Sequence, residues 1–282
     1  MFKSILVPID GSEASFAALQ NAAELARLAQ AELRGLFVED QGKLMPPVWA
    51  QPPADGLLPT AGLAPSVLTL SQEVLKEWEE TGKLIQEAFA EHCRAQGVKG
   101  TLSILRGEDT LIMVEQARRC GLVVMGRRSR LMIGSAPGSH AEALLLKTTR
   151  PVMVVPAGGK RTARVLIAYD SSPAAQRALE YGADFATLQF STVDVLTVGE
   201  SPQRTQAAQE EARQFLGPYQ LDACFVVKAG EPAATITGHA ERIGAGLVVM
   251  GAYGHSRLRE LLFGCTTRDV LKITKCPVLL AA

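Results

Sequence analysis

The chain repeats itself, and this repeat constrains its fold more than any other feature of the sequence. Residues 3–12 read Lys-Ser-Ile-Leu-Val-Pro-Ile-Asp-Gly-Ser, and residues 164–172 follow the same plan. Each segment starts with a basic residue, continues through an aliphatic run and ends in Asp followed by small or hydroxyl-bearing residues. A continuous apolar run of this kind is typical of a strand that is buried on both faces of a parallel sheet.

Later landmarks return in the same order. Residues 122–126 and residues 247–251 both read Leu-Val-Val-Met-Gly, and two last strands are predicted at residues 152–155 and 278–280. Each copy therefore alternates five strands with four helices, which predicts an α/β fold with a parallel sheet covered by helices on both faces. We place domain 1 at residues 1–157 and domain 2 at residues 162–282, with a glycine-rich joint between them.

The two copies differ in one region. After its second predicted strand, residues 33–38, the first copy carries a proline-rich insertion at about residues 42–66, and a long helix is expected from about Val67. The second copy has only a short connection there. The prolines predict a non-helical loop with extended character. Two interpretations stay open, a lid over the first site with Trp49 as its contact, and a plain surface excursion.

Composition excludes several classes of protein. Lys plus Arg and Asp plus Glu both number 29, and this balance argues against a broad nucleic-acid surface or a polybasic membrane anchor. No apolar run approaches the ~20 residues that span a bilayer, and the chain starts directly with a predicted strand. We therefore expect a cytoplasmic protein with neither nucleic acid nor membrane as partner. The five cysteines are scattered without a CxxC pair, so we expect no disulfide and no metal site.

The candidate binding residues stand at the predicted strand ends, because open parallel sheets bind ligands beyond the carboxyl ends of their strands. Asp10 and Asp170 close the first strand of each copy, and Gly126 and Gly251 close the fourth. Glycine lets the backbone approach a ligand closely. In the second copy a further glycine pair leads into a helix start whose unpaired N–H groups suit a phosphate. Three side chains there can add donors to an anion, Cys265, Thr266 and Thr267.

This arrangement resembles the ATP-binding branch of the universal stress protein family, over nearly the whole chain and twice. The pattern is Gly-x2-Gly-x9-Gly after a Val-Val-Met-Gly strand, together with the Asp that closes the first strand. The resemblance implies two tandem Rossmann-like (adenine nucleotide α-hydrolase-like) domains, often paired through the last strand. It also implies ATP, ADP or AMP as ligand, with or without Mg²⁺.

The family's binding positions carry over onto both copies. In the family the first-strand Asp and the end of strand two address the nucleoside, while the glycine loop and the helix start hold ribose and phosphates. In the first copy the corresponding residues are Asp10, Val38, Met125, Gly126, Ser129, Gly138 and Ser139. In the second copy they are Asp170, Val198, Met250, Gly251, Gly254, Gly264 and Cys265, with Thr266 and Thr267 beside them.

Each copy departs from the family pattern. In the first copy Ser129 replaces the second glycine and the following spacing is one residue short; a serine at positive φ costs roughly 1 kcal/mol. In the second copy Cys265 stands where the family has Ser or Thr, and a thiol is a weaker donor. A structural interpretation also stays open, in which the aspartates cap turns and the glycines only form bends. The loop charge Arg127 is either a phosphate ligand or a solvated charge.

The function expected is that of an adenine-nucleotide (ATP) binding protein in stress response or signalling, without efficient catalysis and without catalytic residues. An enzyme, such as a slow ATPase, is one alternative, although neither a Gly-x4-Gly-Lys-[Ser/Thr] loop nor a nucleophile elbow is present. A nucleotide-free scaffold is the other. We also expect residues 152–155 and 278–280 to pair within the chain as a pseudo-dimer, because exposed apolar edge strands invite pairing. A homodimer and an unidentified signalling partner stay open.

Overall fold

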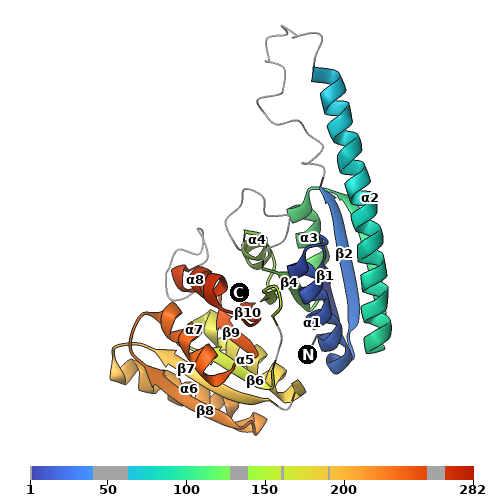
Figure 1. The fold of residues 1–282 in the computed structure, drawn as a ribbon. Helices are drawn as coiled ribbons and strands as arrows, with labels where there is room; N and C mark the ends of the chain where they lie inside the picture. Colours follow the sequence, from blue (N-terminus) through green and yellow to red (C-terminus); the bar gives the residue numbers. More distant parts are fainter. Residues whose placement is uncertain (1, 41–62, 128–138, 160–161, 190, 253–263) are drawn as a thin grey trace.

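The computed structural model describes residues 2–40, 63–127, 139–159, 162–189, 191–252 and 264–282 (Figure 1). These residues contain a single sheet of ten strands, five from each copy. The strands of the first copy are β1 (Ser4–Pro8), β2 (Glu32–Asp40), β3 (Gly100–Gly107), β4 (Leu122–Gly126) and β5 (Val152–Val155). Those of the second copy are β6 (Arg164–Ala168), β7 (Thr192–Val198), β8 (Ala223–Lys228), β9 (Leu247–Gly251) and β10 (Val278–Ala281).

The order of the strands across the sheet is β3-β2-β1-β4-β5-β10-β9-β6-β7-β8. Neighbours within each copy are parallel, whereas β5 and β10 are antiparallel and place Met153 opposite Leu279. The predicted α/β fold, with a five-stranded parallel sheet in each copy, is confirmed, and so is the predicted pairing of the two last strands. Because this joint is antiparallel, the strands of the two copies run in opposite directions. The C-terminal ends of the strands of one copy therefore lie on the same side of the sheet as the N-terminal ends of the strands of the other copy.

Helices cover both faces of the sheet. In the first copy they are α1 (Glu13–Ala29), α2 (Leu63–Gln96), α3 (Asp109–Ala117) and α4 (Ser139–Lys147). In the second copy they are α5 (Pro173–Gln189), α6 (Pro202–Leu216), α7 (Pro232–Ile243) and α8 (Cys265–Ile273), with a short 3₁₀ turn, η4 (Gly217–Tyr219), after α6. The equivalent helices α1 and α5 each start at a serine whose hydroxyl accepts a hydrogen bond from the first turn, Ser12 and Ser172.

Two hydrophobic cores lie on the two faces of the sheet, because successive side chains of a strand point to opposite faces. One core packs under α1, α2, α5 and α6 and includes Met153 and Leu279 at the joint. The other packs under α3, α4, α7 and α8 and includes Val154 and Val278. Both cores therefore continue across the joint between the copies. Within the described residues, no helix combines the length and apolar content that crossing a membrane requires.

The start of α2 corrects one sequence prediction. Residues 63–66 were expected in the proline-rich loop, but α2 begins at Leu63 and includes Pro65 in its first turn. A proline is tolerated there because the first N–H groups of a helix have no intrahelical partner to lose. The rest of the insertion, Trp49 included, falls at residues 41–62 and lies outside the described residues.

Side chains also connect the copies. Arg127 directly follows β4 of the first copy, and its guanidinium donates hydrogen bonds to the backbone oxygens of Leu271 (2.9 Å) and Thr274 at the C-terminal end of α8. The ring of Phe2 stacks on Tyr181 of α5, with ring centroids 5.9 Å apart. Arg127 was interpreted from the sequence as a phosphate ligand or a solvated charge, whereas its hydrogen bonds here support a helix of the other copy.

Candidate functional site

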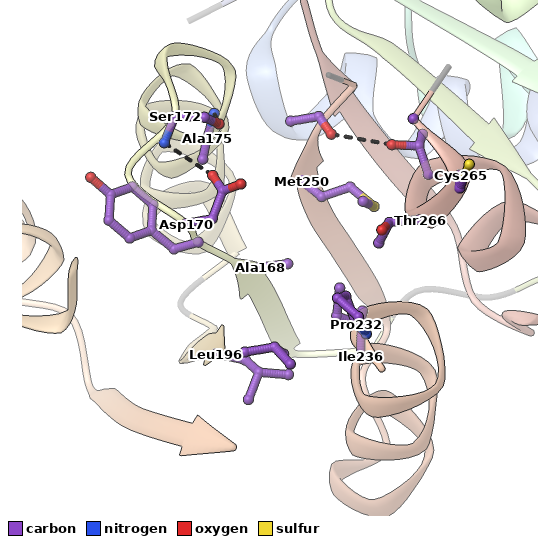
Figure 2. A pocket seen from close by; sticks show the side chains of 15 residues that line it. Ala168, Asp170, Ser172, Ala175, Leu196, Pro232, Ile236, Met250, Cys265 and Thr266 are labelled. Carbon is purple, nitrogen blue, oxygen red and sulfur yellow. Dashed lines mark hydrogen bonds between the residues drawn. The ribbon is translucent and has the colours of Figure 1, made fainter. Parts of the chain in front are cut away.

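A pocket of about 350 Å³ opens in the second copy, beyond the C-terminal ends of β6, β7 and β9 (Figure 2). The N-termini of α5, α7 and α8 border it. Eight residues predicted from the sequence line this pocket: Asp170, Val198, Met250, Gly251, Gly264, Cys265, Thr266 and Thr267. The structure thus brings together the strand ends and the helix start that the pattern singled out. The pocket falls in the size range usual for small-molecule sites.

One side of the pocket is apolar. Leu196 and Val198 from β7, Met250 from β9, and Pro232 and Ile236 from α7 form this side, and Figure 2 shows Pro232 and Ile236 next to each other below the opening. Such a surface suits the flat, weakly polar face of a heterocyclic base. The sequence pattern did not point to Pro232 and Ile236, because apolar side chains at the start of α7 do not by themselves mark it as part of a site.

Asp170 lies across the pocket from Cys265 and Thr266, and it also supports the local backbone (Figure 2). Its Oδ1 accepts a hydrogen bond from Ser172 N (3.0 Å), which fixes the turn between β6 and α5. Asp10 does the same in the first copy, accepting from Ser12 N at 3.1 Å. The turn-capping interpretation therefore holds for both aspartates. Asp170 is exposed and in addition faces the pocket.

The N-terminus of α8 is left open toward the pocket. The neighbouring helix α7 is capped by the Glu231 carboxylate, which accepts from Ala233 N (3.0 Å) and Ala234 N (2.7 Å). At α8 the capping residue is Gly264, which provides no side-chain hydrogen bond. The first amides of α8 therefore keep their partial positive charge for an anion.

The three side chains that open α8 are not equivalent. Cys265 is exposed and Thr266 is half-buried at the pocket. Thr267 is buried, and its hydroxyl donates to Ala252 O (3.0 Å), which holds the helix start against the end of β9. Thr267 thus lines the pocket, but its hydroxyl proton is already engaged in this structure.

A second group of side chains supports the Asp170 turn from behind. Ser171 has φ +62°, the left-handed region, and its hydroxyl donates to Glu211 of α6 (2.7 Å). Gln176 donates to the same carboxylate (2.8 Å). Burial, and after it the carboxylate of Glu211, raise the pKa of Tyr169 well above its ordinary value. This support could not be predicted from the sequence, because α6 is distant in sequence from the turn that it holds.

The equivalent positions of the first copy are built differently. Asp10, Val38 and Met125 are buried, with Asp10 only 6% exposed. Close to the start of α4, His140 Nε2 lies 3.6 Å from Asp109 Oδ2, and Thr110 Oγ1 lies 3.2 Å from His140 Nδ1. The sequence did not reveal this cluster, since nothing in the pattern connects the starts of α3 and α4.

Three predicted site residues, Ser129, Gly138 and Gly254, lie outside the described residues. Ser139 is the first residue of α4. Gly126 closes β4 where the sequence placed it. Among the described residues, no group of three or more His, Cys, Asp and Glu side chains is arranged to hold a metal ion.

Comparison with known proteins identifies the family. The model of the Universal stress protein family matches residues 1–156 and again residues 162–282. Universal stress protein Slr1230 of Synechocystis sp. is 26% identical over 298 residues, which cover 98% of this chain and 99% of that protein. Universal stress protein YxiE of Bacillus subtilis is 25% identical over 143 residues, covering 42% of this chain and 97% of that protein.

A solved structure supports the fold at full length. The crystal structure of a universal stress protein from Archaeoglobus fulgidus DSM 4304 superposes with a TM-score of 0.71 and 22% sequence identity. The superposition covers 99% of this chain and 95% of that one. With the family model matched twice along the sequence, the chain belongs to the universal stress protein family.

Proposed function

We propose that the chain binds an adenine nucleotide in the pocket of the second copy and acts in stress response or signalling. The observation that carries this proposal is the pocket itself, in which an open helix N-terminus lies across from an exposed carboxylate, with an apolar side between them. These three features match the three parts of a nucleotide, namely phosphate, ribose and base.

Each part of the nucleotide has a counterpart of suitable chemistry. The phosphates would accept hydrogen bonds from the first amides of α8, where the helix dipole favours negative charge. The Asp170 carboxylate would accept from a ribose hydroxyl or a base amino group. The base would pack on Leu196, Ile236 and Met250, and this contact would remove their apolar surface from water.

The finer points of the proposal rest on the family resemblance. They are the choice of ATP, ADP or AMP, a Mg²⁺ ion that would arrive with the phosphates, and a cytoplasmic location. We also propose that catalysis is inefficient, with turnover slower than about one per second, the low end of ordinary enzyme rates. The carboxylate of Asp170 and the hydroxyl of Thr267 already hold backbone groups in place, which leaves them poorly suited to move protons during a reaction.

Thermal unfolding with added nucleotide tests the proposal. ATP with Mg²⁺, ADP and AMP are added separately, and bound nucleotide is extracted from the purified protein and identified by mass. A ligand at about a hundred times its Kd adds about 2.7 kcal/mol of stability, so a clear rise in Tm is expected. The absence of any shift, with no nucleotide in the extract, would favour a nucleotide-free scaffold. Rapid multiple turnover of ATP would favour an enzyme.

Two substitutions of one residue separate binding from folding. Asp170→Asn keeps an oxygen that can accept from Ser172 N but removes the charge, whereas Asp170→Ala removes both. We expect Asp170→Ala to weaken nucleotide binding at least about tenfold, as the loss of a hydrogen bond to a charged group does, with Asp170→Asn in between. Asp222→Ala is the control, because Asp222 is exposed just before β8, at the N-terminal ends of the strands and therefore away from the pocket.

A further inference from the structure

We infer that the chain binds one nucleotide, in the second copy alone, because side chains of the first copy close the equivalent site. This inference rests on the function proposed above. It starts from the register of the two half-sheets, which makes the copies comparable residue by residue. Ser4 pairs with Glu32 where Arg164 pairs with Thr192, and Leu33 pairs with Gly100 where Val193 pairs with Ala223.

The same register identifies the residues that replace the pocket lining in the first copy. Gly100 and Ala223 occupy the same register position, so Gly107 at the end of β3 corresponds to Gly230, two residues after the end of β8, and Asp109 corresponds to Pro232. The helices α4 and α8 start one residue after a glycine, so His140 corresponds to Thr266. The first copy thus has a carboxylate and an imidazole where the second has a proline ring and a small hydroxyl side chain.

Asp109 and His140 contact each other at the positions whose equivalents, Pro232 and Thr266, line the pocket of the second copy. His140 Nε2 lies 3.6 Å from Asp109 Oδ2, and Thr110 Oγ1 lies 3.0 Å from Asp109 Oδ1 and 3.2 Å from His140 Nδ1. Asp109 and His140 are only 8% and 6% exposed. In the second copy the residues equivalent to these two line an open pocket instead.

This cluster opposes an anion by volume and by charge. The imidazole ring fills space that Thr266 leaves open in the second copy. With the imidazole neutral, the Asp109 carboxylate places negative charge beside the start of α4, the helix end that would receive the phosphates. Like charges brought together at a site away from bulk water disfavour binding strongly.

A second, independent difference concerns the aspartate that would address the nucleoside. Asp170 is exposed and lines the pocket, whereas Asp10 is 6% exposed. Asp10 Oδ1 accepts from both the backbone N (3.1 Å) and the hydroxyl (2.6 Å) of Ser12. In the first copy this carboxylate is therefore buried, and its Oδ1 is held by the turn.

Arg127, the residue that follows the first loop glycine, also supports a single binding site. Arg127 follows Gly126, and its guanidinium donates to Leu271 O and Thr274 O of the second copy. The first copy thus directs the cationic side chain of Arg127 to the far end of α8, the helix whose N-terminus borders the pocket. It supports the binding copy rather than a ligand of its own.

Native mass spectrometry with ATP and Mg²⁺ tests the inference, because it counts nucleotides per chain. We expect the wild type to saturate at one. The decisive variant carries Pro232→Asp and Thr266→His, which gives the second copy the residues of the first. It should lose binding by at least about tenfold, as expected for a like charge placed at a phosphate site. Asp and His already stand at the equivalent helix starts of the first copy, so the variant is expected to fold, and circular dichroism checks this.

The matched control carries Asp109→Pro and His140→Thr, the reverse exchange. It should keep at least one bound nucleotide with an unchanged Kd. Two nucleotides on the wild type, retained binding in the Pro232→Asp, Thr266→His variant, or lost binding in the control would each overturn the inference. A wild type that binds none of ATP, ADP and AMP would instead overturn the proposed function itself, so the two failures are distinguishable.

Discussion

Gly126 and Gly251 are required by packing before any ligand is considered. A Cβ on Gly251 would lie 2.9 Å from both Ala174 Cβ and Ala175 N, at the first turn of α5. A Cβ on Gly126 would lie 2.6 Å from the backbone carbon of Ala14 in α1. The strand end and the helix start approach so closely that a side chain does not fit. This close approach is also what aligns the Asp170 turn with the end of β9.

The first prediction follows from this contact. Gly251→Ala should lower the free energy of unfolding by about 1–3 kcal/mol, the usual cost of overpacking a buried site, and urea denaturation measures it. Gly238→Ala in α7 is the matched control, because a Cβ there meets nothing within 4 Å. It should stabilise the protein by up to about 1 kcal/mol through helix propensity. Equal urea midpoints for Gly251→Ala and the wild type would contradict the packing argument.

His239 is a buried histidine whose pKa is lowered by burial first, and then by the positive charges of Lys228 and Arg242; nearby Asp194 opposes the shift. Arg242 donates to His239 Nδ1 (3.1 Å), so the neutral ring carries its proton on Nε2, which lies 3.6 Å from Asp194 Oδ1. The folded protein therefore holds the neutral ring, while the unfolded chain protonates its histidine near the ordinary pKa of about 6.5.

The second prediction is a pH dependence. Neutral His239 makes its full contribution to the free energy of unfolding above about pH 6.5. This contribution is lost as the pH falls from there toward the pKa of His239 in the folded protein, which is lower. Between pH of about 7 and 5, wild-type stability should fall more steeply than that of His239→Gln, measured by urea denaturation at each pH. Gln116 occupies the equivalent position of the first copy, which makes Gln the natural replacement. Parallel curves for the two proteins would rule this out.

At the scale of elements, α8 is the helix on which the pocket depends, and it is supported at both ends. Its start is held by the Thr267 hydroxyl on Ala252 O, and its C-terminal carbonyls accept from Arg127 of the other copy. A cation at a helix C-terminus is favoured by the helix dipole, as an anion is at the N-terminus. Arg127 therefore stabilises the helix in the same sense as a bound phosphate would.

The third prediction concerns this support. Arg127→Ala should speed amide hydrogen exchange in α8 and lower the free energy of unfolding by up to about 2 kcal/mol, the upper end for a partly buried charged group at a helix end. Arg119→Ala is the control, because Arg119 forms an exposed ion pair with Glu115 one turn away in sequence, and such pairs contribute little. Unchanged exchange in α8 would show that the carbonyl contacts are not needed.

At the scale of the whole molecule, the sequence predicts the features that the two copies share. The repeat predicted the ten strands, and the apolar last strands predicted that β5 and β10 pair, but not that they are antiparallel. The eight pocket residues were predicted from strand ends, glycine bends and the family resemblance, because these features leave a local signature in the sequence. The sequence did not predict the cluster of Asp109 and His140, the support from Arg127 or the part of Pro232. Each of these depends on which helix starts and ends become neighbours, and that is decided by packing in three dimensions.

The joint between β5 and β10 makes this protein a dimer whose two halves share one backbone. In a symmetric homodimer every substitution appears twice, so a change that closes one site closes both. Here a residue can be exchanged in one half while its counterpart stays as it was. In a single continuous chain, one copy can therefore keep a binding pocket while the other copy loses its own and supports the first.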